Sequence, residues 1–265
     1  MRLSVSTAAK GWSLGHPVLD EAESVIGFSV SDTGMGIAPG VLYELLPFPA
    51  DYEPYTFSHV MESVQLLRDF VAAGVRGLKL YPGYEAFYVH DARMRVVYEL
   101  AGEFGVPVMI HTGDTFDPKG KVKYAHPLEV DEIAVDFRDV TFVICHLGNP
   151  WVTDAMEVIY KNDNVVGDIS GFTLGHFDER FEQYMLQKVK QVVTFAGDPS
   201  SLLFGTDWPI CQISSYLRFV RNLGLSEQET ELVLWKNTAR IFNLDPSTFA
   251  CRVPEVEEAD VAARE

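Results

Sequence analysis

The sequence predicts an α/β fold, a (β/α)8 barrel in which parallel strands alternate with helices. Three observations lead to this prediction. From residue 74 onward, short apolar runs alternate with longer stretches of helical periodicity, which is the pattern of repeated βα units. The chain of 265 residues is long enough for one large domain with a buried core. Polar residues directly follow several of the apolar runs, at the positions from which the loops of a barrel start.

Five apolar runs in this part of the chain are predicted strands. They cover Val75–Tyr81, Val106–His111, Val140–His146, Val165–Ile169 and Leu202–Asp207. Their short length and their content of Val, Ile and Leu are typical of strands that are buried on both faces of a parallel sheet.

Helical patterns with recognisable ends separate these strands. Asp91 can cap a helix that ends near Gly105, and Pro127 can open another that buries Leu128, Ile133 and Val135. A capping-box pattern, Ser226–Glu229, precedes a further apolar stripe. Each strand is therefore expected to be followed by a helix.

Upstream of residue 74 the pattern is less regular. Val25–Val30 is a predicted strand, Arg2–Ser6 is a second candidate, and Val60–Val71 has the periodicity of an amphipathic helix. Residues 34–54 are rich in Gly and Pro, which indicates a long loop. A closed barrel needs eight strands, so we expect a barrel that is incomplete or divergent at its N-terminal end.

We expect one barrel domain over residues 1–250, followed by an acidic, flexible tail over residues 251–265. An incomplete barrel would expose strand edges that must be covered or paired. Residues 1–24, the loop 34–54 or a second subunit could cover them, and we expect a homo-oligomer.

Composition excludes several classes of partner. The formal net charge is −17 and the pI is about 4.7, which argues against nucleic acid and anionic membrane because both are bound through clustered Lys and Arg. The three cysteines lack a CxxC spacing, so neither a disulfide framework nor a cysteine zinc site is indicated. No membrane-spanning run or signal segment is visible, and we expect a cytoplasmic protein that acts on a small molecule.

Three predicted strands end in polar residues that a buried strand would not choose for packing. These residues are His111, His146 and Asp207. The carboxyl ends of parallel barrel strands open on one face, so residues distant in sequence can converge there. Two imidazoles and a carboxylate are ligands that zinc and related divalent ions prefer, and a bound ion would turn water into a nucleophile near neutral pH. Asp207 could also accept the proton of that water, and His146 could act as a base.

Five further residues are candidates for substrate binding or for support of this site. Alternation directs Lys79 and Tyr81 to the same side, into the barrel, where a buried lysine needs a partner. Asp114 could hold a ligand histidine in one tautomer or simply turn its loop. His126 could reach the site or cap a helix, and Trp208 could line a pocket or pack.

Each of these residues also has a purely structural explanation. A single histidine after a strand is more often a hydrogen-bonded structural residue than a ligand. Lys79 could form a salt bridge with an Asp of a neighbouring strand, such as Asp168. The functional interpretation rests on three polar residues that occupy the same position in three βα units.

At these residues the sequence resembles the amidohydrolase superfamily, specifically its amidohydrolase-related group, amidohydrolase 2. This group of TIM-barrel proteins contains metal-dependent hydrolases and decarboxylases. The resemblance runs from about Val25 to Leu244. It rests on five segments, taken in order: residues 77–82 (GLKLYP), 109–113 (MIHTG), 144–148 (ICHLG), 204–209 (FGTDWP) and 237–242 (NTARIF).

The resemblance implies a role for each residue of the site. His111 would be a metal ligand after strand five, His146 a second ligand or general base after strand six, and Asp207 a ligand and proton acceptor after strand eight. Lys79 would lie on strand four, where some relatives carry a carboxylated bridging lysine. Relatives often have His where Tyr81 stands, which is a departure from the pattern.

The larger departure is at the front of the chain. The family's first strand ends in His-x-His, a pair of metal ligands, and these 265 residues contain no such motif. With Val25–Val30 aligned to the family's third strand, 24 residues precede it, whereas two βα units need about 30 residues each.

Three hypotheses of function follow. The first is a metal-dependent hydrolase that uses metal-activated water, with zinc as the expected ion and with occupancy in question because the His-x-His pair is missing. The second keeps the site but runs a non-oxidative decarboxylation or a metal-free lactone hydrolysis, with Asp207 and His146 as acid and base. The third is a non-catalytic barrel protein that has lost the metal site.

Overall fold

The computed structural model describes residues 2–9, 24–31, 65, 67–69, 71–72, 74–208 and 210–245. The chain divides into two compact units, Met1–Tyr52 and Glu53–Glu265, and each is described by itself. The predicted barrel domain over residues 1–250 stays a prediction. The predicted loop 34–54 and the acidic tail 251–265 lie outside the described residues.

The first unit contains two strands, β1 (Arg2–Ala9) and β2 (Ser24–Ser31). They pair antiparallel, with Arg2 opposite Ser31 and Ala9 opposite Ser24. Both candidate strands of this region are therefore strands, but they form a two-stranded sheet of their own. Val25–Val30 thus pairs with β1, and not with a parallel barrel strand as the family alignment implied.

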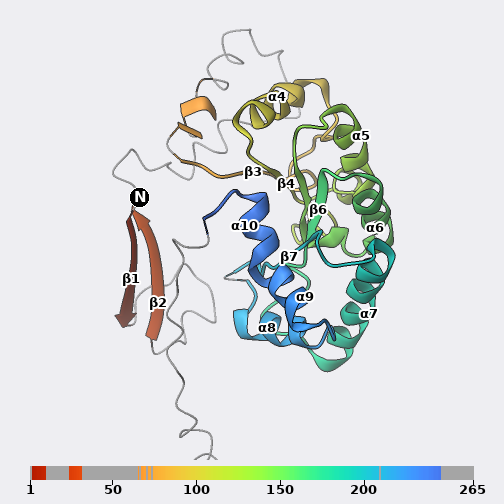
Figure 1. Cartoon of the computed structure of the whole chain (residues 1–265). Coiled ribbons are helices and arrows are strands. Elements are labelled where there is room, and N and C mark those ends of the chain that lie inside the picture. The colour runs from red at the N-terminus through yellow and green to blue at the C-terminus, as the bar shows by residue number, and fades with distance from the viewer. Residues whose placement is uncertain are drawn as a thin grey trace, which may run out of the picture. The chain divides into compact units, whose positions relative to one another are not determined.

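The second unit is built on a five-stranded parallel sheet in the order β3-β4-β5-β6-β7 (Figure 1). The strands are β3 (Leu78–Leu80), β4 (Val108–Ile110), β5 (Phe142–Ile144), β6 (Val165–Asp168) and β7 (Leu202–Leu203). Each lies within one of the five predicted strands, and neighbours in sequence are neighbours in the sheet. This is the arrangement of successive strands in a TIM-like barrel.

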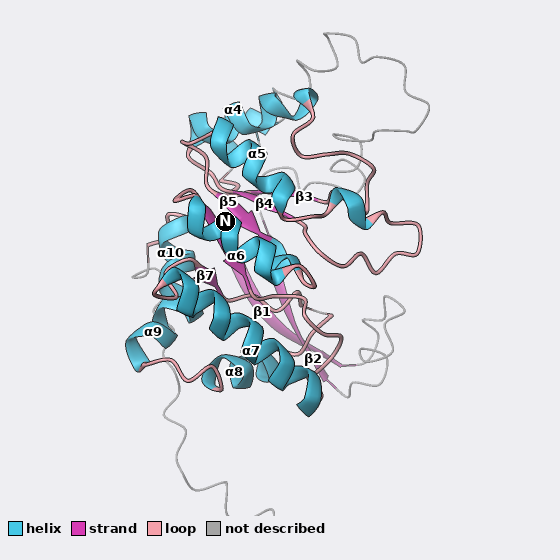
Figure 2. Cartoon of the chain, turned by 90° about the vertical axis from the view of Figure 1, so that its right-hand side faces the viewer, coloured by secondary structure: helices cyan, strands magenta, loops and turns pink. Residues whose placement is uncertain are grey.

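Helices follow the strands. They are η1 (Ala92–Met94), α4 (Arg95–Phe104), η2 (Val122–Tyr124), α5 (Leu128–Asp136), η3 (Cys145–Gly148), α6 (Val152–Lys161), α7 (Glu179–Ala196), α8 (Ile213–Arg221), α9 (Glu227–Glu231), the π-helix η4 (Leu232–Lys236) and α10 (Asn237–Ile241). Of these, α5, α6 and α7 cover the outer side of the sheet (Figure 2), whereas the end of α10 packs against the other face. None of the helices in the described parts of the chain has the length and apolar character needed to span a bilayer.

The predicted helix ends agree with the structure. The Asp91 side chain accepts a hydrogen bond from the Arg93 backbone N–H, and α4 ends at Gly105 in a left-handed conformation. Both hydrogen bonds of the capping box are present at Ser226–Glu229. The predicted buried face of α5 is confirmed at Ile133, which is 3% exposed, and is wrong at Leu128 and Val135, which are 49% and 43% exposed.

The register of the sheet decides which side chains point inward. Leu80, Ile110 and Ile144 stand in one register row and are buried. Because side chains alternate along a strand, the residues one position further point to the opposite face. That next row contains the end of each strand or the residue after it, namely Tyr81, His111, Cys145 and Asp168. A row of mostly polar groups therefore lies at the carboxyl ends of β3 to β6.

An apolar cluster adjoins this row on the same face. It consists of Val143, Val166 and Leu203, with Leu203 level with Asp168, and Met109 packs against it together with Ile241 and Phe242 at the end of α10. The polar row therefore lies between this apolar core and the loops that follow the strands.

Candidate active site

The two predicted histidines lie together. The ring centroids of His111 and His146 are 5.1 Å apart, with 62° between the ring planes. His111 directly follows β4, and its backbone N–H continues the strand pairing by donating to the Leu80 carbonyl. The His111 ring is 3% exposed, and its Nε2 is a buried atom without a hydrogen-bond partner in the described part of the chain.

His146 reaches this position through an unusual backbone conformation. In the register of β5 the inward position is taken by Cys145. His146 and Leu147 then adopt left-handed conformations, with φ values of 60° and 44°. Non-glycine residues rarely adopt this conformation, and here it turns the His146 ring toward His111.

Asp168 and Ser170 hold the other side of His146. Asp168 Oδ1 accepts hydrogen bonds from the backbone N–H groups of His146 (3.0 Å) and Ser170 (2.9 Å) and from the Ser170 hydroxyl (2.5 Å). His146 Nδ1 lies 3.1 Å from the Ser170 carbonyl oxygen and 3.0 Å from Ser170 Oγ. Burial disfavours the charged carboxylate, but His146, Lys79 and the Ser170 hydroxyl outweigh it and hold the pKa of Asp168 below its ordinary value.

Asp207 stands beside His146. A Cβ built on Gly171 would overlap the His146 ring and would lie 3.2 Å from Asp207 Oδ2. Gly171 is therefore required where these two side chains approach each other. Asp207 itself has a φ of 61°, so it shares the rare left-handed conformation of His146.

Lys79 contacts Cys145, which the sequence did not indicate as a residue of the site. Its Nζ donates to Cys145 Sγ over 2.8 Å. Burial disfavours the ammonium charge, but Cys145 and Asp168 outweigh this effect and raise the pKa of Lys79. Burial also raises the pKa of the Cys145 thiol. Lys79 therefore carries a positive charge just below the two histidines.

Aromatic rings surround His111. The centroid of the Tyr84 ring lies 4.8 Å from that of His111, and Tyr81 stacks on His111 at 6.3 Å. Tyr81 and Tyr84 are 48% and 40% exposed, so both rings border the solvent above the buried imidazole.

The environment keeps His111 neutral. Burial is the main cause, and the neighbouring His146 and Lys79 add to it, so that the pKa of His111 falls to about 3. A neutral imidazole with an unpartnered Nε2 offers a lone pair to a proton donor or to a cation.

The remaining candidates lie outside this cluster or at its edge. His126 Nδ1 accepts a hydrogen bond from the Leu128 N–H, its Nε2 lies 3.5 Å from Asp154 Oδ2, and its ring contacts Trp151, so its contacts are with α5 and with the start of α6. Asp114 is exposed, and its backbone N–H donates to the Asn149 carbonyl. Trp208 follows Asp207 and is 56% exposed. The predicted roles of these three residues stay predictions.

A comparison with protein-family models matches residues 60–244 to the family described as amidohydrolase. The match spans more than half of the chain and includes both histidines and Asp207. The chain belongs to the amidohydrolase family.

Solved structures agree with this assignment. A TIM-barrel protein from Bordetella bronchiseptica is 25% identical, with a TM-score of 0.58 over 72% of this chain and 64% of that one. A protein assigned as a 2-pyrone-4,6-dicarboxylic acid hydrolase, from Pseudomonas putida, is 21% identical, with a TM-score of 0.51 over 69% of this chain and 68% of that one.

A third similar structure is a dihydroxybenzoic acid decarboxylase from Polaromonas sp. JS666, which contains manganese and the inhibitor 2-nitroresorcinol. It is 15% identical, with a TM-score of 0.52 over 70% of this chain and 66% of that one. In the first of these comparisons, this amidohydrolase spans less than two thirds of the length of the Bordetella protein. No match was found among curated proteins.

The side chains of this amidohydrolase indicate which groups could bind a metal ion. The unpartnered His111 Nε2 and the adjacent His146 ring are two suitable nitrogen donors. However, the described residues contain no group of three or more His, Cys, Asp or Glu side chains placed to hold an ion. Asp207 therefore does not complete a three-ligand site with the two histidines in this geometry, and a structural zinc site would need four ligands.

Ser170 and Cys145 are contacts of the site that the sequence did not predict. The register could have found Cys145, because it stands level with His111 across β4 and β5. Ser170 follows Asp168 by two residues and so points to the same side of the chain.

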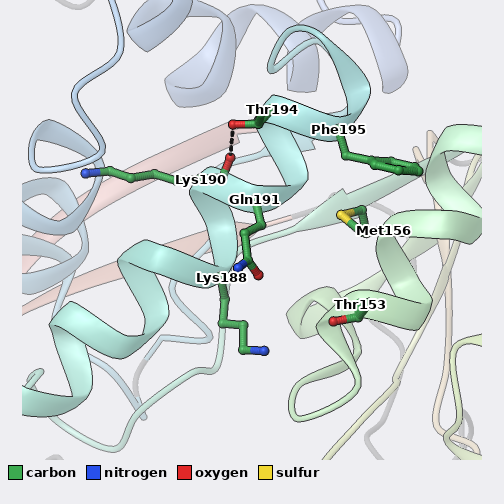
Figure 3. Close-up of a pocket in the computed structure, with 7 residues that line it drawn as sticks. All are labelled: Thr153, Met156, Lys188, Lys190, Gln191, Thr194 and Phe195. Carbon is green, nitrogen blue, oxygen red and sulfur yellow. Dashed lines mark hydrogen bonds between the residues drawn. The ribbon is translucent and has the colours of Figure 1, made fainter.

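A groove on the outer surface of the amidohydrolase is separate from these residues. It lies between α6 and α7 and has a volume of about 820 Å³ (Figure 3). Seven residues line it, from Thr153 and Met156 on α6 to Lys188, Lys190, Gln191, Thr194 and Phe195 on α7. None of them is a candidate for the chemistry.

Proposed function

We propose that this chain is a hydrolase of the amidohydrolase type, which adds water to a small-molecule substrate at His111, His146 and Asp207. The observation that carries the proposal is the buried Nε2 of His111, which has no hydrogen-bond partner among the described residues and lies beside the His146 ring. A buried polar atom without a partner costs free energy, so its retention fits a binding role. Membership of a family of enzymes supports the same conclusion.

The side chains can divide the chemistry between them. Asp207 can accept the proton of the attacking water, because its carboxylate is beside His146 and reachable from solvent. Asp207 can then return this proton to the leaving group, His146 can act as a ligand or as the base in its place, and Lys79 can stabilise negative charge that develops nearby. The exposed rings of Tyr81, Tyr84 and Trp208 would border the substrate, with Asp114 and His126 further out.

We also propose that a divalent ion, expected to be zinc, takes part. His111, His146 and Asp207 would be its ligands, and it would supply polarised water. The manganese in the Polaromonas relative supports a divalent ion, whereas the lack of a gathered three-ligand group among the described residues predicts weak binding. Metal analysis of protein purified without chelators tests this. A content below about a tenth of an equivalent of any divalent ion per chain would contradict the metal-dependent form of the proposal.

The reaction itself can be tested with the substrates named for the relatives. We expect 2-pyrone-4,6-dicarboxylate, a lactone, to be opened with incorporation of ¹⁸O from labelled water. Asp207→Asn and His111→Gln should each reduce the rate by about 100-fold or more. His90→Gln is the matched control, because His90 is a half-exposed histidine that pairs with Glu129 of α5, and it should stay within about threefold of the parent. Equal loss in all three variants would contradict the assignment of the site.

Decarboxylation is the second candidate, and the fold similarity to the Polaromonas decarboxylase favours it. Asp207 and His146 would then act as acid and base on a carboxylated ring. Release of CO₂ from a dihydroxybenzoate, without ¹⁸O incorporation, would replace the hydrolase proposal with this one.

A non-catalytic barrel protein is the third candidate. It is favoured by the lack, among the described residues, of three ligand side chains placed to hold one ion. Two results together would support it: the protein catalyses neither reaction, and His111→Gln does not weaken its binding of 2-pyrone-4,6-dicarboxylate or of a dihydroxybenzoate. We propose a cytoplasmic location for either enzyme, with a small molecule as its partner and with neither nucleic acid nor membrane.

A further inference from the structure

The surroundings of His146 fix where its proton must lie. His146 Nδ1 is within hydrogen-bond distance of two atoms, the carbonyl oxygen of Ser170 at 3.1 Å and its hydroxyl oxygen at 3.0 Å. A carbonyl oxygen can only accept a hydrogen bond. The carbonyl contact therefore requires a proton on Nδ1.

The hydroxyl contact leads to the same requirement. Ser170 has a single hydroxyl proton, and Asp168 Oδ1 stands 2.5 Å from the same oxygen. The carboxylate cannot donate when it is ionised, so the Ser170 hydroxyl donates its proton in the hydrogen bond to Asp168. The Ser170 oxygen is then left as an acceptor toward His146, and Nδ1 faces two acceptors and no donor.

Asp168 is itself held so that it cannot turn away. Its Oδ1 also accepts the backbone N–H groups of His146 and Ser170. Asp168 and Ser170 are 4% and 7% exposed, so water cannot easily supply a replacement donor. Gly171 leaves no side chain between this network and the imidazole.

We infer that Asp168 and Ser170 are positioning residues that lock neutral His146 in the tautomer with the proton on Nδ1, which leaves the lone pair on Nε2. Neither residue touches the reacting atoms; both act through the imidazole. The value of that lone pair for catalysis rests on the proposed function, because a base or a ligand needs it. The tautomer itself does not rest on it.

Nitrogen-15 NMR of the histidine side chains tests the inference on the whole chain without substrate. The spectrum is recorded at about pH 8.5, above the ordinary histidine pKa, and His146→Asn identifies the His146 signals. We expect a protonated Nδ1 and an unprotonated Nε2, both before and after treatment with a chelator. A proton on Nε2 of His146 in the parent protein would overturn the inference.

Ser170→Ala tests the contribution of the hydroxyl. It removes one of two acceptors from Nδ1, so the ratio of the two tautomers should fall by about fivefold, the effect of one lost hydrogen bond. Ser215→Ala is the matched control, because Ser215 is also buried and its hydroxyl accepts the Phe177 N–H elsewhere in the fold. A tautomer ratio that is the same in both variants would show that Ser170 only fills space.

This experiment separates the inference from the proposed function. The protein can show the expected tautomer and fail both activity tests, in which case only the function is wrong. It can also hydrolyse the lactone with the proton on Nε2, in which case only the inference is wrong.

Discussion

At the scale of single residues, backbone conformation sets the candidate site apart. His146, Leu147 and Asp207 adopt left-handed conformations, with φ values between 44° and 61°. Such conformations cost about 1–2 kcal/mol for a residue with a side chain, and they are typical of functional sites, where surrounding contacts maintain them. At His146 the contacts with Asp168 and Ser170 provide that support.

The buried imidazole of His111 should make stability depend on pH. In the unfolded chain His111 binds a proton below about pH 6.5, whereas in the folded chain its pKa is about 3. Stability is therefore complete above pH 6.5 and is lost as the pH falls. We expect the free energy of unfolding to fall by about 1.4 kcal/mol for each pH unit between about pH 6 and pH 4.5.

Urea unfolding at several pH values measures this effect. The His111→Gln variant supplies the comparison, because it removes this titration and leaves every carboxyl group in place. Parallel curves for the parent and the variant would mean that His111 is protonated equally in both states.

At the scale of elements, the loops after β4 and β5 are joined directly. The Asp114 N–H donates to the Asn149 carbonyl across the two loops, and the Gly113 N–H donates to the Ala125 carbonyl within the segment after β4. Gly113 has a φ of 91°, and a Cβ there would overlap the Asn149 carbonyl oxygen. This close approach holds His111 at the end of one strand beside His146 at the end of the next.

Gly113→Ala should therefore be more destabilising than an ordinary glycine substitution. We expect a loss of about 3 kcal/mol, because both the backbone conformation and the steric overlap oppose the methyl group. Gly197→Ala is the matched control: its φ is 92°, but no atom lies within 4 Å of the added Cβ. It should cost about 1 kcal/mol. Equal urea midpoints for the two variants would contradict a close contact between the loops.

At the scale of the whole molecule, five parallel strands with helices on their outer side form part of a TIM-like barrel. The apolar cluster of Val143, Val166 and Leu203 supports the row of polar residues above it. Since the core and the site use alternate positions of the same strands, stability and chemistry are divided between neighbouring rows of one sheet.

We expect the chain to form a homo-oligomer. Strand edges in a barrel with few N-terminal strands need cover, and a second copy can provide it. Sedimentation velocity at about 0.15 M salt, where the repulsion expected from a net charge of −17 is screened, should give a mass that is a multiple of 29.7 kDa. A single species of 29.7 kDa across the micromolar range would refute this expectation.

The sequence by itself determined the alternation of strands and helices, the family and the polar residues that follow three of the strands, because hydrophobic periodicity and local motifs are written in neighbouring residues. Only His111 directly follows its strand, whereas Asp207 lies four residues beyond the end of β7. Only the tertiary structure decided that His146 turns toward His111 through a left-handed bend, that Cys145 takes the inward position beside Lys79, and that Ser170 faces the imidazole. It also decided that β2 pairs with β1. These features depend on register and on contacts between distant segments, and residue type alone does not specify them.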